Sequence, residues 1–166
     1  MDNGYFQSAT YGKLTLPQVR KHLLAFMEKD PNCRYRIVIG SDSAPREGKN
    51  LDFITALVIH RVGKGGIYFW KRIVKDKIYP NKDFSFLRQR IYQEATLSLT
   101  TADEFLEVVK NDGISKFDVE IHVDIGKFGE TRDMITEVVG MIRGSGFICK
   151  TKPESYGASK VADRHT

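Results

Sequence analysis

Two aspartates lie where a carboxylate at the end of a strand could bind a cation. Asp42 follows the apolar residues 37–39 and a glycine, and Asp124 lies near the end of the segment 119–126, in which apolar and polar residues alternate. If the two predicted strands are parallel neighbours, both carboxylates reach the same edge of a sheet, where ligands of α/β proteins collect. Side chains alternate along a strand, so Asp124 shares its face of the strand with His122.

Two further acidic residues lie on predicted helices. Glu94 falls within the inward stripe of one helix, whose other members are Leu87, Ile91, Ala95 and Ser98. A carboxylate on a core-facing stripe is destabilising unless it meets a cation or several hydrogen-bond donors, and an ion pair with an arginine is the structural alternative. Asp163 lies on the last predicted helix, where Lys160 and Arg164 are weak surface partners.

Together the four carboxylates predict a site for divalent metal. Acidic groups that are brought together repel each other and raise one another's pKa values. A hard cation removes this difficulty, and Mg²⁺ or Mn²⁺ prefers such oxygen ligands. Two ions about 3.5–4 Å apart could activate a water molecule and stabilise the leaving oxygen of a phosphodiester.

The elements that position these residues follow from hydrophobic periodicity and turn residues. Thr15 and Pro17 begin a helix over 15–30, and residues 1–13 are expected to be a flexible N-terminus. The core elements are strands at 34–43, 53–61 and 67–74, a helix from Asp83 past Glu107 in one or two pieces and ended by Gly113, a strand at 117–125, a helix from Glu130-Thr131, a strand at 147–150 and a last helix capped by Ser155.

This order, β-β-β-α-β-α-β-α after an extra N-terminal helix, predicts an α/β fold. The sheet is expected to be five-stranded and mixed, with helices on its faces, in a single domain over 14–166 whose core is 34–166. The length of 166 residues fits one domain, and 41% hydrophobic with 28% charged residues is typical of a globular protein.

Composition also indicates where the protein works. No apolar run approaches the roughly 20 residues of a membrane span, and the first residues do not resemble a signal peptide. Cys33 and Cys149 lie far apart and outside any Cys-x-x-Cys spacing, which favours reduced thiols. We therefore expect a cytoplasmic protein with no membrane partner.

A basic segment suggests a polyanionic partner. Between Arg61 and Arg90 the chain has nine basic residues against two acidic ones. Such a local excess can attract nucleic acid, with Lys71, Arg72 and Lys75 as candidate contacts. The alternative is an edge hairpin whose lysines block pairing with other sheets.

The order of elements and the acidic positions resemble the ribonuclease H-like superfamily, and more closely the bacterial YkuK-type RNase H-like family. The matching segments are Gly-Ser-Asp-Ser at 40–43, Gln-Glu at 93–94 with Ser-Leu at 98–99, His-Val-Asp-Ile-Gly at 122–126, Glu-Val-Val-Gly-Met at 137–141, and residues 155–156 and 162–166. The resemblance covers nearly everything from Tyr35 onward. It implies an RNase H-like sheet and a nuclease that uses Mg²⁺ or Mn²⁺.

The resemblance also implies roles for single residues. Asp42 would bridge two metal ions, Asp124 would share one, Glu94 would hold the other or orient its water, and Asp163 would complete the set. His165 would help to shuttle protons or release product.

Three nearby side chains have supporting roles in this interpretation. His122 is expected to be a hydrogen-bonded histidine beneath the site rather than a ligand. Ser41 and Ser43 would donate hydrogen bonds to the carboxylates or to phosphate.

The predicted function is a metal-dependent nuclease acting on RNA, RNA–DNA hybrid or structured DNA. Ala44 stands where RNase H-like 3′–5′ exonucleases have a second acid, which argues against that activity. The chain also has no separate basic handle segment, although the hairpin from Arg61 to Lys77 could substitute for one. The alternative is a non-catalytic nucleic-acid-binding or regulatory module of the same fold.

Overall fold

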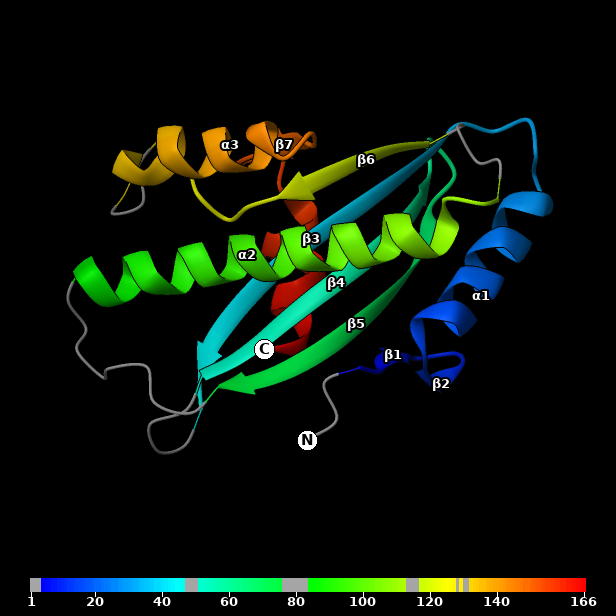
Figure 1. Ribbon diagram of the computed structural model, residues 1–166, viewed down its shortest axis with the longest axis horizontal. Coiled ribbons are helices and arrows are strands. Elements are labelled where there is room, and N and C mark those ends of the chain that lie inside the picture. The colour runs from blue at the N-terminus through cyan, green and yellow to red at the C-terminus, as the bar shows by residue number, and fades with distance from the viewer. Residues whose placement is uncertain (1–3, 47–50, 76–83, 113–116, 128, 130–131) are drawn as a thin grey trace.

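A computed structural model describes residues 4–46, 51–75, 84–112, 117–127, 129 and 132–166 (Figure 1). Its centre is one mixed sheet of seven strands in the order β2-β1-β5-β4-β3-β6-β7. The strands are β1 (Phe6–Ser8), β2 (Gly12–Leu14), β3 (Tyr35–Pro45), β4 (Leu51–Arg61), β5 (Gly66–Lys75), β6 (Phe117–His122) and β7 (Ile148–Lys150). The α/β class and the mixed sheet agree with the prediction, but the predicted strand number of five was wrong.

The two additional strands form a short hairpin where no regular structure was expected. β1 pairs with β2 and touches β5 through the pair Gln7 and Trp70. Phe6 and Leu14 are buried in the main core, and Gly12 adopts a positive φ of 70° in the turn. Three-residue strands are too short to show periodicity, so only the burial of these two side chains reveals the hairpin.

The three long strands β3, β4 and β5 form an antiparallel meander. β6 then pairs parallel with β3 on its other side, and β7 pairs parallel with β6. β-branched residues form the run 37–39 of β3 and recur in β4, and both strands are buried along most of their length.

The helical elements are α1 (Leu16–Glu28), α2 (Phe84–Val109), η1 (Arg132–Met134), α3 (Ile135–Gly144), η2 (Gly157–Ala162) and η3 (Asp163–His165). The predicted start of α1 is confirmed, because Thr15 forms a capping box with Gln18. α2 is one continuous helix. Asp83, Gly113, Glu130 and Thr131, which were assigned to helix ends, lie outside the described residues.

The last helix differs from the expectation. After Ser155 the chain forms six residues of π-helix and three of 3₁₀-helix instead of a regular α-helix. Both types are weaker than an α-helix and occur only in short pieces. None of the helices in the described ranges combines the length and apolar character that a bilayer crossing requires.

Helices lie on both sides of the sheet. In Figure 1, α2 crosses in front of β3 and β4, whereas the red C-terminal turns lie behind them. Alternation along β3 sends Ile37 and Ile39 into the main core with α2, and Val38 and Gly40 toward η2. A Cβ on Gly40 would lie 2.4 Å from the backbone nitrogen of Ala158, so this glycine permits η2 to pack on the sheet.

Candidate functional site

The candidate site lies where β3 and β6 separate. Their parallel pairing ends at Gly40 and His122. The residues after β6 remain hydrogen-bonded to β7 and to the residues that follow it. Val123 N donates to Lys150 O at 3.0 Å, and Lys152 N donates to Ile125 O at 2.8 Å. Within the described residues β3 continues paired with β4, so β3 and β6 diverge at their carboxyl ends, the usual ligand position in α/β sheets. We call this point of divergence the opening.

Asp42 and Asp124 each lie two residues beyond that last pair, and β3 and β6 are the parallel neighbours that bring both residues to one edge of the sheet. Asp42 is half-buried, and this burial raises the pKa of its carboxyl to about 6, with repulsion from Asp163 and Asp124 adding to the effect. The carboxyls of Asp42 and Asp163 are close enough to share a hydrogen bond. The Thr166 hydroxyl donates weakly to Asp42 Oδ2, at 3.4 Å.

Asp124 has a basic neighbour. Lys152 Nζ lies 3.3 Å from Asp124 Oδ1. That oxygen is nevertheless buried and accepts no hydrogen bond from the described residues, so the contact is an ion pair without hydrogen-bond geometry. A buried carboxylate oxygen without a donor is a plausible ligand for a cation.

Glu94 comes from α2, on the opposite side of β3. It is 8% exposed, and Ser43 Oγ donates to its Oε1 at 2.5 Å. Arg90 donates to the hydroxyl and the carbonyl oxygen of Ser43, at 3.0 and 2.5 Å, and so fixes the serine rather than pairing directly with Glu94. Burial raises the pKa of Glu94 to about 8, and repulsion from Asp42 and Asp124 contributes.

The four carboxylates therefore gather around one opening from three directions. In the described part of the chain, no three acidic, histidine or cysteine side chains are arranged closely enough to hold a metal ion. The donor set nevertheless fits a hard divalent cation chemically, because it consists of oxygens. Two of the acids have raised pKa values, and one oxygen lacks a donor.

The two histidines near the site have different surroundings from each other. His122 is buried, its Nδ1 accepts a hydrogen bond from Gly157 N at 3.1 Å, and burial lowers its pKa to about 4. It is the hydrogen-bonded histidine that the sequence suggested. The His165 ring stacks on Trp70, with centroids 3.8 Å apart, and its Nε2 lies 3.0 Å from the Tyr68 hydroxyl.

The candidate nucleic-acid contacts do not share one surface. Lys71 is 7% exposed and its Nζ lies 3.3 Å from Glu104 of α2. Arg72 is exposed on the other face, where its Nη2 donates to His165 O at 2.6 Å. Lys75 is half-buried at the end of β5.

Sequence reasoning missed Tyr68 and Trp70. Alternation along β5 could have placed them, because residues 68, 70 and 72 share the face opposite to that of Lys71. Ser41 is buried and bonds with Thr55 and Ser98, both at 2.8 Å, so it supports α2 rather than a carboxylate.

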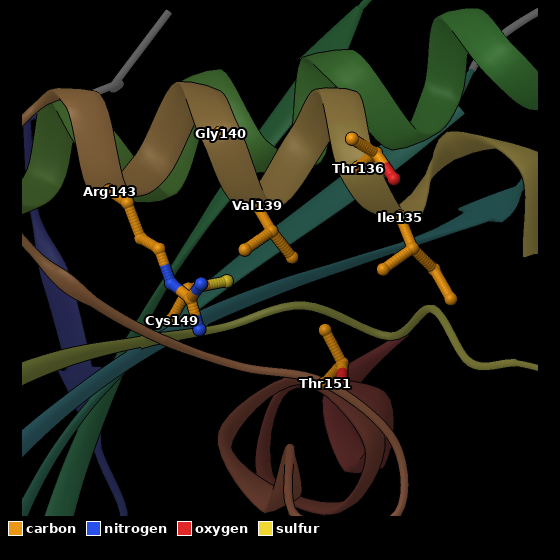
Figure 2. A pocket seen from close by; sticks show the side chains of 7 residues that line it. All are labelled: Ile135, Thr136, Val139, Gly140, Arg143, Cys149 and Thr151. Carbon is orange, nitrogen blue, oxygen red and sulfur yellow. The ribbon is translucent and has the colours of Figure 1, made fainter.

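A separate pocket of about 420 Å³ lies between α3 and β7. Figure 2 shows Arg143 of α3 reaching toward Cys149 of β7, with Thr151 on the opposite wall. The pocket contains none of the four carboxylates, and we assign it no part in the site.

Comparison with known proteins gives a consistent result. A family model described as ribonuclease H-like matches residues 18–166. A protein of Bacillus subtilis (strain 168) named "Uncharacterized protein YkuK" is 34% identical over 175 residues, covering 99% of this chain and 98% of that protein. No solved structure gives a significant match.

Proposed function

The chain belongs to the ribonuclease H-like family, and we propose that it is a divalent-metal-dependent nuclease acting on RNA, RNA–DNA hybrid or structured DNA. The observation that carries the proposal is the meeting of Asp42, Asp124 and Asp163 at the opening between β3 and β6, with Glu94 close enough to repel two of them. A bound cation offsets both the repulsion between the acids and the cost of burying their charges.

In this proposal the four carboxylates hold Mg²⁺ or Mn²⁺. The bound ions supply an activated water and stabilise the leaving oxygen of the phosphodiester. Glu94 must lose its proton to become a ligand. The hydrogen bond from Ser43 favours the charged form of Glu94, and Arg90 keeps Ser43 oriented for it.

Basic side chains beside the carboxylates offer contacts for the phosphates. Arg72 is exposed on the same side of the sheet as Asp42, and Lys152 is about half exposed beside Asp124. Contacts of this type bind the backbone without reading the bases, so the proposal predicts salt-dependent affinity.

The test compares Asp42→Asn with Asp118→Asn. Asp118 is a surface residue near the start of β6, paired with Arg34 and remote from the opening, so its variant is the matched control. End-labelled RNA, hybrid duplex and branched DNA are incubated with Mn²⁺ or Mg²⁺. We expect Asp42→Asn to lose at least about a hundredfold in rate, since it removes a metal ligand, and Asp118→Asn to keep the wild-type rate. Cleavage by Asp42→Asn at the wild-type rate would contradict the proposal.

A non-catalytic nucleic-acid-binding module is the second candidate. Three of the acids already have partners within the protein, so they do not need a metal ion to be stabilised. These contacts join Ser43 to Glu94, Lys152 to Asp124 and Thr166 to Asp42. This candidate predicts salt-dependent binding of the same nucleic acids with no cleavage by the wild-type protein, and Mn²⁺ without effect on the melting temperature.

A further inference from the structure

The C-terminal turn η3 is fastened to β5 through one residue, His165. Its ring lies nearly parallel to the Trp70 indole, with an angle of 8° and a centroid distance of 3.8 Å. The Tyr68 hydroxyl pairs with His165 Nε2, and Arg72 Nη2 donates to the His165 carbonyl oxygen. Three neighbouring side chains of one strand face thus hold this single residue.

Trp70 is itself held in place by packing against buried residues. It packs with Val161 against the fully buried Ile54, Ala56 and Ala162. Ala56 of β4 is also the direct strand partner of Trp70. The indole therefore joins the sheet, the end of η2 and the ring of His165 in one packed unit.

Asp163 needs such support because its own element is weak. η3 has only three residues, and Thr166 N donates to Asp163 O at 3.2 Å at its end. Asp163 is exposed, and it lies beside the carboxyl of Asp42. Repulsion between two ionised carboxylates pushes the turn away from the sheet unless another contact holds it.

We propose that Trp70 is a positioning residue, which holds η3 through the stacked ring of His165 and so keeps Asp163 beside Asp42 for metal binding. The inference rests on the proposed function, because it concerns the same metal site. It also assigns His165 a different part from proton transfer, since its Nε2 faces Tyr68 on β5. Neither Trp70 nor His165 touches the metal in this account.

The experiment measures Mn²⁺ affinity by titration calorimetry for wild type, Trp70→Ala, His165→Ala, His165→Phe and Asp163→Asn. His165→Phe keeps a ring for the stack and removes the bond to Tyr68, so it is the conservative rescue. We expect the two alanine variants to bind Mn²⁺ about tenfold more weakly, and His165→Phe to stay within about threefold of wild type.

The double variant His165→Ala with Asp163→Asn shows whether His165 affects Mn²⁺ binding through Asp163 or through a general loss of stability. If His165 acts through Asp163, the double variant binds Mn²⁺ no more weakly than Asp163→Asn alone. Full additivity of the two losses overturns the inference. His165→Ala with wild-type affinity overturns it as well, while the proposed function stands.

Trp70 is the single tryptophan of the chain, so its emission reports the stack without any metal. We expect His165→Ala to change this emission and His165→Phe to change it less. Identical metal-free emission of wild type and His165→Ala shows that the stack does not form in solution and overturns the inference. A wild-type protein that binds no Mn²⁺ overturns the proposed function and the inference together.

Discussion

The two sides of β3 offer their carboxylates very different surroundings. On the α2 side, Ser41, Ser43 and Glu94 lie in a buried, hydrogen-bonded layer under a helix of 26 residues. On the other side, Asp42 is half-buried and Asp163 is exposed, and Asp163 belongs to the short turn η3 that follows η2. The acids on the two sides of β3 therefore lie in a buried layer under a long helix and in a more exposed layer beside short turns.

The difference appears in protonation. Burial raises the pKa of Glu94 to about 8 and that of Asp42 to about 6. Near pH 7 without metal, Glu94 is thus mostly protonated and Asp42 mostly ionised. The buried side supplies Glu94, which is fixed but mostly neutral, and the open side supplies Asp42, which is mostly charged.

Substituting Gly40 affects the open side most strongly. Gly40→Ala places a methyl group 2.4–2.5 Å from backbone atoms of Ala158 and Gly157, which cannot move aside as a side-chain end can. We expect a loss of about 3 kcal/mol in the free energy of unfolding, measured with urea, and a changed Trp70 emission as η2 shifts.

The matched control is Gly140→Ala. Gly140 lies inside α3, and nothing lies within 4 Å of the added methyl group. This variant should gain up to about 1 kcal/mol, because alanine favours the helix. Equal stability of the two variants would show that η2 is not packed closely on β3.

Glu94→Gln tests the buried side through pH. The pKa of Glu94 is raised above its ordinary value of 4.5, so its contribution to stability is complete below pH 4.5 and is lost as pH rises through about 8. Between pH 5 and pH 8 the metal-free wild type should therefore lose on the order of 3 kcal/mol more than Glu94→Gln.

Urea unfolding at the two pH values measures this difference. Glu107→Gln, a substitution of an exposed glutamate on the same helix, serves as control and should keep the wild-type pH dependence. If Glu94→Gln also keeps it, Glu94 is not a buried protonated acid. Asp42 then accounts for the pH dependence instead, and the contrast between the two sides disappears.

Periodicity predicted most of the fold, because the elements concerned are long. The alternation in β3 to β5 and the stripe of α2 span enough residues to be recognised, and the Thr15 cap marked the start of α1. The hairpin of β1 and β2 was missed because each strand has three residues. The irregular turns after Ser155 were taken for an α-helix, since local sequence does not encode the packing against Gly40 that shapes them.

For the candidate site, the sequence placed the acids better than it placed their partners. Strand position brought Asp42 and Asp124 to one opening, and the inward stripe brought Glu94 toward it. Alternation in β5 was not applied to the basic residues, so Lys71 was grouped with Arg72 although the two point to opposite faces. The stack of His165 on Trp70 joins residues 95 positions apart, and a single sequence gives no indication of such a contact.

The smallest expected effect separates Arg72 from Lys71 as contacts for nucleic acid. Arg72→Ala removes one exposed cation on the Asp42 side, and it should weaken binding of a labelled duplex several-fold and lower the salt slope by about one. Lys71→Met keeps the buried stem but removes the pairing with Glu104 on the α2 side, so it should leave affinity and salt slope unchanged. Fluorescence anisotropy over a range of salt concentrations, at a metal concentration too low for cleavage, measures both. An equal loss of affinity in the two variants would mean that nucleic acid contacts both sides of the sheet. The proposal that the substrate binds on the Asp42 side would then be wrong.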